Sequence, residues 1–504
     1  MTWSSDGSHN AAASDDGFNY LLFSDVHLGS DIVPHVRPWA ERSWLRQEAD
    51  VDAALVALLA HHRKERDPAR PWRLVVAGDF LDLVGVSLSA AADLRTPPTE
   101  EELRCGLGSA ADHVVHKVHA IAARHPRVFR ALMEFVAEGH ALVVVRGNHD
   151  VELHWRAAQR AFVDAIVAHA EVHERAAISR RIEICPWFFH VHGLLYVEHG
   201  QEFDPMCSYG NPLVPTWEKD QRRIRPTPFS VLLRQVARPT PGLSSSSYGY
   251  VGMGAYVWLC VRLGVRGTLR IAARYARACW DLISECAVRG LKGADRVRVS
   301  SRAKLARYDS LPSRMRRFAQ RTGVSEERLR ALLSVYVGSA VDSLSVMVRS
   351  LYVDRIASLF LTLLGLLVAL LLYVLVGPTS AAVSAGLALA SFVFACVGRG
   401  VNTSPNDSLR HGAERIAKLF NVRWVVMGHT HEPVMEPMST GATYVNLGSW
   451  GQDDTPEERS MAHDCTQTFL TLRRLDNDYR ADLLRWDPVR GVVEGFRRLS
   501  VSPP

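Results

Sequence analysis

Five short polar motifs in this chain carry residue types that bind metal ions and transfer protons. They are Ser24-Asp25-Val26-His27, Gly78-Asp79-Phe80-Leu81-Asp82, Arg146-Gly147-Asn148-His149-Asp150, Glu198-His199-Gly200 and Gly428-His429-Thr430-His431. Carboxylate and imidazole groups together favour Mn²⁺, Fe or Zn²⁺, whereas Mg²⁺ and Ca²⁺ prefer shells made only of oxygen. Histidine is also the side chain whose unperturbed pKa lies nearest to neutral pH. The motifs therefore predict metal-assisted chemistry with proton transfer.

Each motif follows an apolar segment that we predict to be a buried strand. These segments are rich in Leu, Val and aromatic residues, and they cover residues 20–24, 73–77, 141–145, 194–198 and 423–427. In open α/β sheets, ligands bind outside the carboxyl ends of the strands. The Gly147–Asp150 motif alone would also fit an ordinary turn. Five such coincidences in one chain are hard to produce by chance, and they indicate a binding site at the strand ends.

In this order, the D-x-H, G-D-x-x-D, G-N-H-D, H-G and G-H-x-H motifs resemble those of the calcineurin-like metallophosphoesterase family. The resemblance covers roughly residues 17–208 and 411–480, and residues 446–449 resemble the family's closing N-x-G-S turn. It implies an α/β fold in which a β-sandwich is flanked by helices. It also implies hydrolysis of a phosphate ester bond (monoester, diester or pyrophosphate) with two metal ions that hold the attacking and leaving oxygens.

The resemblance assigns seven metal ligands residue by residue. Asp25, His27 and His431 would hold the first ion, Asn148, His199 and His429 the second, and Asp79 would bridge the two. Mn²⁺ is the expected metal, with Fe and Zn²⁺ as alternatives. His149 is expected to be catalytic, as the general acid that protonates the leaving oxygen. We expect Asp82 to orient a ligand histidine.

The amino-acid composition changes along the chain, and these changes divide it into predicted segments. Residues 1–16 are polar and predict a disordered tail, residues 17–208 and 411–485 form the two parts of the catalytic unit, and residues 486–504 are predicted as a C-terminal tail. Residues 209–355 are predicted as a largely helical insertion that carries a basic block. From Arg262 to Arg330 there are 18 Lys and Arg against 6 Asp and Glu, although the whole chain has a net charge of only +6. The eight cysteines form no C-x-x-C pair and fit a reducing compartment.

The insertion also contains a long uncharged segment. Between Arg355 and Arg399 lie 43 residues without a charged side chain. Residues 357–376 are dominated by Leu and Val, and a helix of this length spans a bilayer core of about 30 Å. We therefore predict a transmembrane helical hairpin at 356–398, which makes the protein a two-pass membrane protein with its catalytic domain in the cytoplasm. A buried helix pair is the alternative.

These features predict a membrane-anchored phosphoesterase with a phosphorylated, lipid-linked substrate and membrane lipids as partners. A nuclease that binds nucleic acid along the basic block, or a cyclic-nucleotide phosphodiesterase, is the alternative. A further alternative is a non-catalytic membrane scaffold that retains its metal ligands. Bacterial enzymes that hydrolyse UDP-diacylglucosamine share the family fold but carry Arg in place of His149, which argues against a direct match. We also expect a catalytic unit with a short linker in place of about 209–405 to bind both metals.

Overall fold

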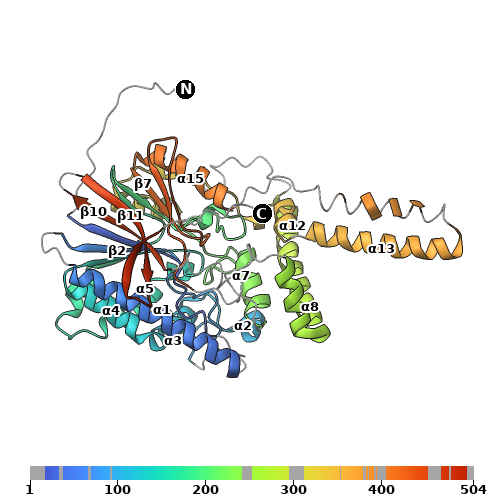
Figure 1. Ribbon diagram of the computed structural model, residues 1–504, viewed down its shortest axis with the longest axis horizontal. Helices are drawn as coiled ribbons and strands as arrows, with labels where there is room; N and C mark the ends of the chain where they lie inside the picture. The colour runs from blue at the N-terminus through green and yellow to red at the C-terminus, as the bar shows by residue number, and fades with distance from the viewer. Residues whose placement is uncertain are drawn as a thin grey trace.

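Two mixed β-sheets form the centre of the fold, which confirms the α/β part of the predicted fold class (Figure 1). The computed structural model describes residues 17–32, 38–65, 70–90, 93–240, 253–293, 311–351, 353–377, 405–451, 467–475 and 478–496, with a few positions between 382 and 393. The predicted tail at 1–16 lies outside these residues. The segment 486–504, predicted as a tail, contributes strand β12 (Val492–Gly495).

The larger sheet has seven strands in the order β12-β11-β10-β1-β2-β3-β4. In chain order its other members are β1 (Asn19–Phe23), β2 (Trp72–Ala77), β3 (Ala141–Val145), β4 (Ile182–Cys185), β10 (Thr468–Leu475) and β11 (Asp478–Asp487). The smaller sheet has five strands in the order β5-β6-β7-β9-β8. Its members are β5 (Phe189–Val191), β6 (Leu195–Val197), β7 (Trp424–Met427), β8 (Val434–Pro437) and β9 (Thr443–Asn446).

One apolar core joins the two sheets face to face. Tyr20 and Leu22 of β1 pack there with residues of β6 and β7, including Val197 and Val426. Because neighbouring side chains of a strand point to opposite faces, Leu21 and the other alternate residues of β1 point outward into a second core. Each central strand is therefore apolar on both faces, which explains the continuous apolar segments of the sequence.

Helices cover the outer face of the larger sheet. They are α1 (Pro38–Lys64), α3 (Ala111–Arg124), α4 (Pro126–Ala137) and α5 (Arg156–Val167). Phe129 of α4 and Phe162 of α5 meet edge to face with ring centroids 5.9 Å apart, inside the core that also buries Phe23 of β1. The outer face of the smaller sheet packs against α15 (Pro405–Phe420) and against α10 (Leu311–Thr322) and α11 (Glu326–Leu333) of the insertion.

The described part of residues 209–355 is largely helical. It comprises α7 (Pro228–Leu232), the π-helical turn η3 (Leu233–Ala237), α8 (Met253–Gly293), α10, α11 and α12 (Leu344–Ser350). Thr227 caps α7, since its side chain accepts a hydrogen bond of 3.2 Å from the backbone N–H of Ser230. Residues of α7, η3, α8 and α12 share an apolar core around Leu282 and Met347.

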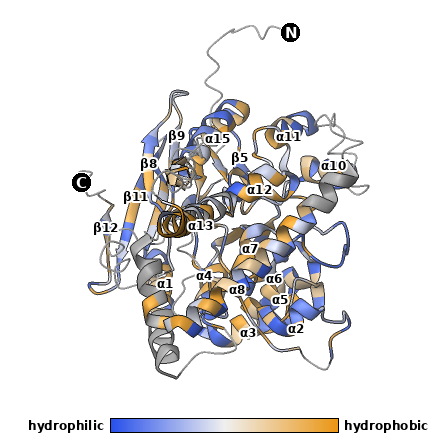
Figure 2. Ribbon diagram, turned by 90° about the vertical axis from the view of Figure 1, so that its right-hand side faces the viewer, coloured by the Kyte–Doolittle hydropathy of each residue, from blue (hydrophilic) through white to orange (hydrophobic). Residues whose placement is uncertain are grey.

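Helix α13 (Val353–Leu375) extends away from the sandwich (Figure 1), and its described residues are coloured as hydrophobic in Figure 2. It exposes leucines such as Leu363 and Leu367. Within the part of the chain that the structure describes, no helix has both the length and the apolar character that crossing a bilayer requires. The prediction of a two-pass membrane protein with a transmembrane hairpin at 356–398 is therefore wrong. The cytoplasmic location of the catalytic domain is derived from that hairpin and loses its basis. Most of the predicted second arm, 381–397, lies outside the described residues.

Candidate metal centre

The five polar motifs lie in loops that follow β1, β2, β3, β6 and β7. Strands β1, β2 and β3 are mutually parallel in the larger sheet, and β6 and β7 are parallel in the smaller one. Their carboxyl ends therefore share one edge of the sandwich. Backbone hydrogen bonds join the loops there, such as the bond from Asp25 N–H to Gly78 O (3.2 Å) and the bond from Gly428 N–H to His199 O (3.0 Å). The structure thus brings together all seven predicted ligands.

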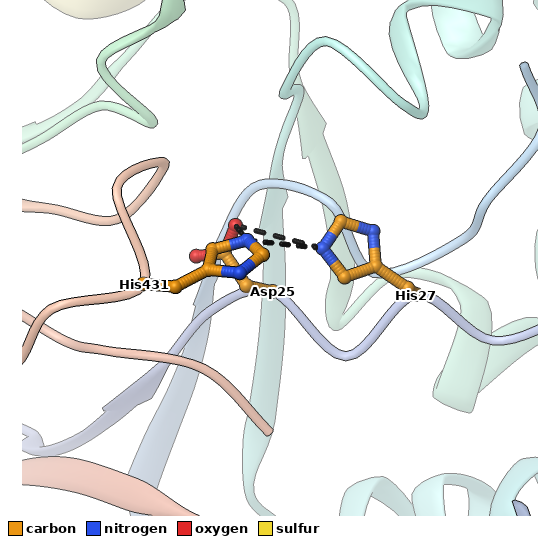
Figure 3. A group of neighbouring side chains, drawn as sticks. All are labelled: Asp25, His27 and His431. Atoms are coloured by element: carbon orange, nitrogen blue, oxygen red, sulfur yellow. Dashed lines mark hydrogen bonds and ion pairs between the residues drawn. The ribbon is translucent and has the colours of Figure 1, made fainter. Parts of the chain in front are cut away.

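Asp25, His27 and His431 form the first group of candidate ligands (Figure 3). His431 Nε2 lies 3.1 Å from Asp25 Oδ1 and 3.3 Å from His27 Nε2, and His27 Nε2 lies 3.8 Å from Asp25 Oδ1. Two ligand atoms that are each roughly 2.1 Å from one metal ion, at right angles, are about 3.0 Å apart. The spacing fits a single ion held by these three side chains.

Asn148, His199 and His429 form the second group. Asn148 Oδ1 lies 3.0 Å from both His199 Nε2 and His429 Nδ1. Asp79 Oδ2 lies 3.1 Å from His199 Nε2, and Asp79 clusters with Asp25 as well as with His199. Asp79 therefore lies where the two groups meet, which is the position expected for a bridging ligand.

Hydrogen bonds turn the metal-facing nitrogens of the second group inward. His199 Nδ1 donates to Ala77 O at 2.9 Å, and His429 Nε2 donates to Asp204 Oδ2 at 3.2 Å. These bonds fix the tautomers and leave His199 Nε2 and His429 Nδ1 to face Asn148. Sequence reasoning missed Asp204, because only the fold shows which nitrogen of His429 faces away from the site.

The site buries carboxylates beside imidazoles, and these groups shift one another's pKa values. Burial alone would raise the pKa of Asp25, but His199 and His431 lower it to about 2. Burial alone would lower the pKa of His199, but Asp79 and Asp25 raise it to about 10. Within the described residues Asp25 Oδ1 is buried and accepts no hydrogen bond. The carboxylates of Asp25 and Asp79 and the imidazole nitrogens beside them form a donor set that fits metal ions.

Backbone strain concentrates on the same residues. Asp25, His27, Asp79, His429 and His431 all have positive φ, between 52° and 74°. A non-glycine residue in this left-handed region costs on the order of 1–3 kcal/mol, and such residues cluster at functional sites. The fold therefore holds five of the seven candidate ligands in conformations that the chain would otherwise avoid.

His149 lies beside the first group without belonging to it. Its ring centroid is 4.3 Å from that of His27, and its Nδ1 lies 2.6 Å from Asp82 Oδ1. Burial lowers the pKa of His149, although the charge of Asp79 opposes the shift. Asp82 orients this catalytic candidate and not a ligand histidine, which corrects our prediction for Asp82.

The insertion contacts the site directly. The ring of Phe229 lies 4.9 Å from that of His149, and Arg238 forms an ion pair with Asp82. The hydroxyl of Tyr209 donates to Asn148 O at 3.2 Å, and that of Tyr336 donates to Glu198 at 2.6 Å. These contacts argue against our expectation that residues 209–405 can be removed without damage to the site.

No protein-family model matches this chain, and a comparison with curated proteins finds no match. The resemblance to metallophosphoesterases therefore rests on the five motifs, and the grouping of candidate ligands rests on the geometry described above.

Proposed function

We propose that the protein is a phosphoesterase of the calcineurin-like metallophosphoesterase type that depends on two divalent metal ions. The observation that carries the proposal is the convergence of seven candidate ligands from five loops into two groups that meet at Asp79. Their carboxylate, amide and imidazole groups favour Mn²⁺, with Fe and Zn²⁺ as alternatives. When bound, two such ions activate water and stabilise the charge on the phosphate oxygens.

The protein side chains around the metal groups position the substrate's leaving oxygen and move a proton to it. Asp82 accepts the Nδ1–H of His149, which leaves Nε2 to exchange the proton. Burial lowers the pKa of His149, whereas the charge of Asp79 opposes this shift and favours the protonated ring that can donate to the leaving oxygen. Phe229 packs on the ring and Arg238 pairs with Asp82, so both hold His149 in place.

The substrate in this proposal is a phosphorylated molecule, and the bond that is hydrolysed belongs to a phosphate monoester, a phosphate diester or a pyrophosphate. Nuclease activity is the second candidate, because α8 exposes Arg266, Arg270 and Arg277 on one helix. Arginines on an exposed surface bind nucleic-acid phosphates in a salt-dependent manner. A steep loss of DNA or RNA binding between about 50 and 200 mM salt would favour this candidate.

The proposal is tested by a turnover screen and by metal analysis. Purified protein with Mn²⁺ is assayed on p-nitrophenyl phosphate, bis(p-nitrophenyl) phosphate and a nucleoside diphosphate ester. Asp79→Asn is expected to lose turnover and metal, because it removes a charge shared by the two groups. Asp164→Asn, which changes an exposed residue of α5, is the matched control. If Asp79→Asn retains two metals and near-normal turnover, the assignment is wrong.

A further inference from the structure

A cavity of about 370 Å³ lies at the seam between the catalytic unit and the insertion. Val84 and Val151 line it from the catalytic side, and Ile224, Val231 and Leu282 line it from the insertion. Pockets for small organic molecules typically measure roughly 300–1,000 Å³ and are mostly apolar. The size and the walls of this cavity therefore fit a small organic ligand.

Seven of the eight charged residues that line the cavity form ion pairs, and the eighth, Asp281, is exposed. Arg223 Nη2 lies 2.8 Å from Glu102 Oε2, and Arg234 Nε lies 3.1 Å from Glu101 Oε1. On the catalytic side Glu152, which is 3% exposed, pairs with the buried Lys117. An anionic ligand would have to displace an acid from its arginine, whereas an uncharged ligand leaves every pair intact. The walls therefore select against a phosphate and for an uncharged group.

The cavity shares its wall with the loop that carries Asn148 and His149. Tyr209 lines the cavity, and its hydroxyl donates to Asn148 O at 3.2 Å. Val84 also lines the cavity, and its N–H donates to His149 O at 3.0 Å. A ligand that packs on Tyr209 and Val84 therefore restricts the backbone that positions one candidate metal ligand and the candidate acid.

We propose that this cavity binds an uncharged apolar group and that its occupancy is coupled to the metal site. The group belongs either to the substrate's alcohol or to a separate small molecule. The binding step follows from the cavity alone, whereas the coupling rests on the proposed function. The two parts are therefore tested by separate measurements.

Binding is tested with N-phenyl-1-naphthylamine, an uncharged probe that fluoresces in apolar surroundings, on the full-length protein. Val231→Trp fills the cavity and should weaken probe binding at least tenfold. Val172→Trp adds the same side chain at a position that is 77% exposed and outside the cavity, and it should leave binding unchanged. If Val231→Trp fails to fold by circular dichroism, Ile224→Phe replaces it. Equal binding by the wild type and the folded cavity variant overturns the proposal, because the probe then binds elsewhere, for example on α13.

Coupling is tested by two measurements. The first is the Mn²⁺ affinity of the protein with and without the probe, and the second is kcat/KM for n-alkyl phosphates of increasing chain length. If the group belongs to the substrate, kcat/KM rises with chain length in the wild type and stays flat in Val231→Trp. If it belongs to a separate ligand, the alkyl series is flat but the probe shifts Mn²⁺ affinity at least threefold, and Mn²⁺ shifts probe affinity by the same factor. A flat series with no shift overturns the coupling. Probe binding does not need turnover, so a failure of the proposed function remains distinguishable from a failure of the binding step.

Discussion

Replacement of Asp204 tests the second metal group through a residue outside the predicted ligand set. The carboxylate accepts the Nε2–H of His429 at 3.2 Å, and its side chain is 16% exposed. Burial raises the pKa of Asp204, but the hydrogen bond and charge of His429, together with the hydrogen bond from the Met206 N–H, lower it below its usual value. Asp204→Asn removes the negative charge that makes His429 Nδ1 a stronger donor to a metal. A side chain that hydrogen-bonds to a metal ligand in this way contributes roughly 10–100-fold to metal affinity, or about 1.4–2.7 kcal/mol.

We expect Asp204→Asn to weaken Mn²⁺ binding at the second group by about 10–100-fold and to leave the first group unchanged. Calorimetric titration of metal-free protein with Mn²⁺ measures the two binding steps separately. Asp164→Asn, with the same charge change on the exposed face of α5, is the control. Two unchanged binding steps, or two steps weakened equally, would refute the assignment of His429 Nδ1 to the second group.

Three further predictions concern the acid, a buried ion pair and a buried histidine. His149→Ala should retain its metals but lose about 10²–10⁴-fold in turnover, with a smaller loss for p-nitrophenyl esters, which need little protonation. Lys117→Met leaves Glu152 buried without its cation and should cost about 3–5 kcal/mol in urea unfolding, most of which Glu152→Gln should restore. Burial lowers the pKa of His62 from 6.5 to about 4, so protonation favours the unfolded chain. Stability should therefore fall by about 3 kcal/mol between pH 6.5 and 4, and His62→Phe should reduce this fall in urea titrations.

The central strands and the grouping of the candidate metal ligands could be predicted because their signals are local. The strand expected at 141–145 is β3 itself, and the strand expected at 73–77 is β2 with one residue added at its start. Each ligand lies within a few residues of a strand end, so the apolar segment and the polar motif after it are enough to place it. The parallel pairing of the strands then brings the motifs together.

The contacts that orient the site could not be predicted, because they join residues far apart in the chain. Phe229 and Arg238 come from a segment with no family pattern, and only the fold places them against His149 and Asp82. Local hydropathy likewise predicted the helical conformation of α13 correctly but led to a wrong conclusion about the membrane. A window of sequence reports how apolar a segment is, and it does not report what that segment contacts.

The pairing of β6 with β7 across the insertion has a consequence for biosynthesis. His199 leaves the ribosome 230 residues before His429 (429 minus 199), which at about 5–20 residues per second is a delay of roughly 10–50 s. Through this time the nascent chain holds Asp25, Asp79 and Asn148 without His431, which completes the first group, and without His429, which completes the second. The edge of β6 also has no partner strand until β7 emerges. A nascent chain therefore exposes an unpaired strand edge during this delay, and the set of candidate ligands is complete only after translation has passed His431.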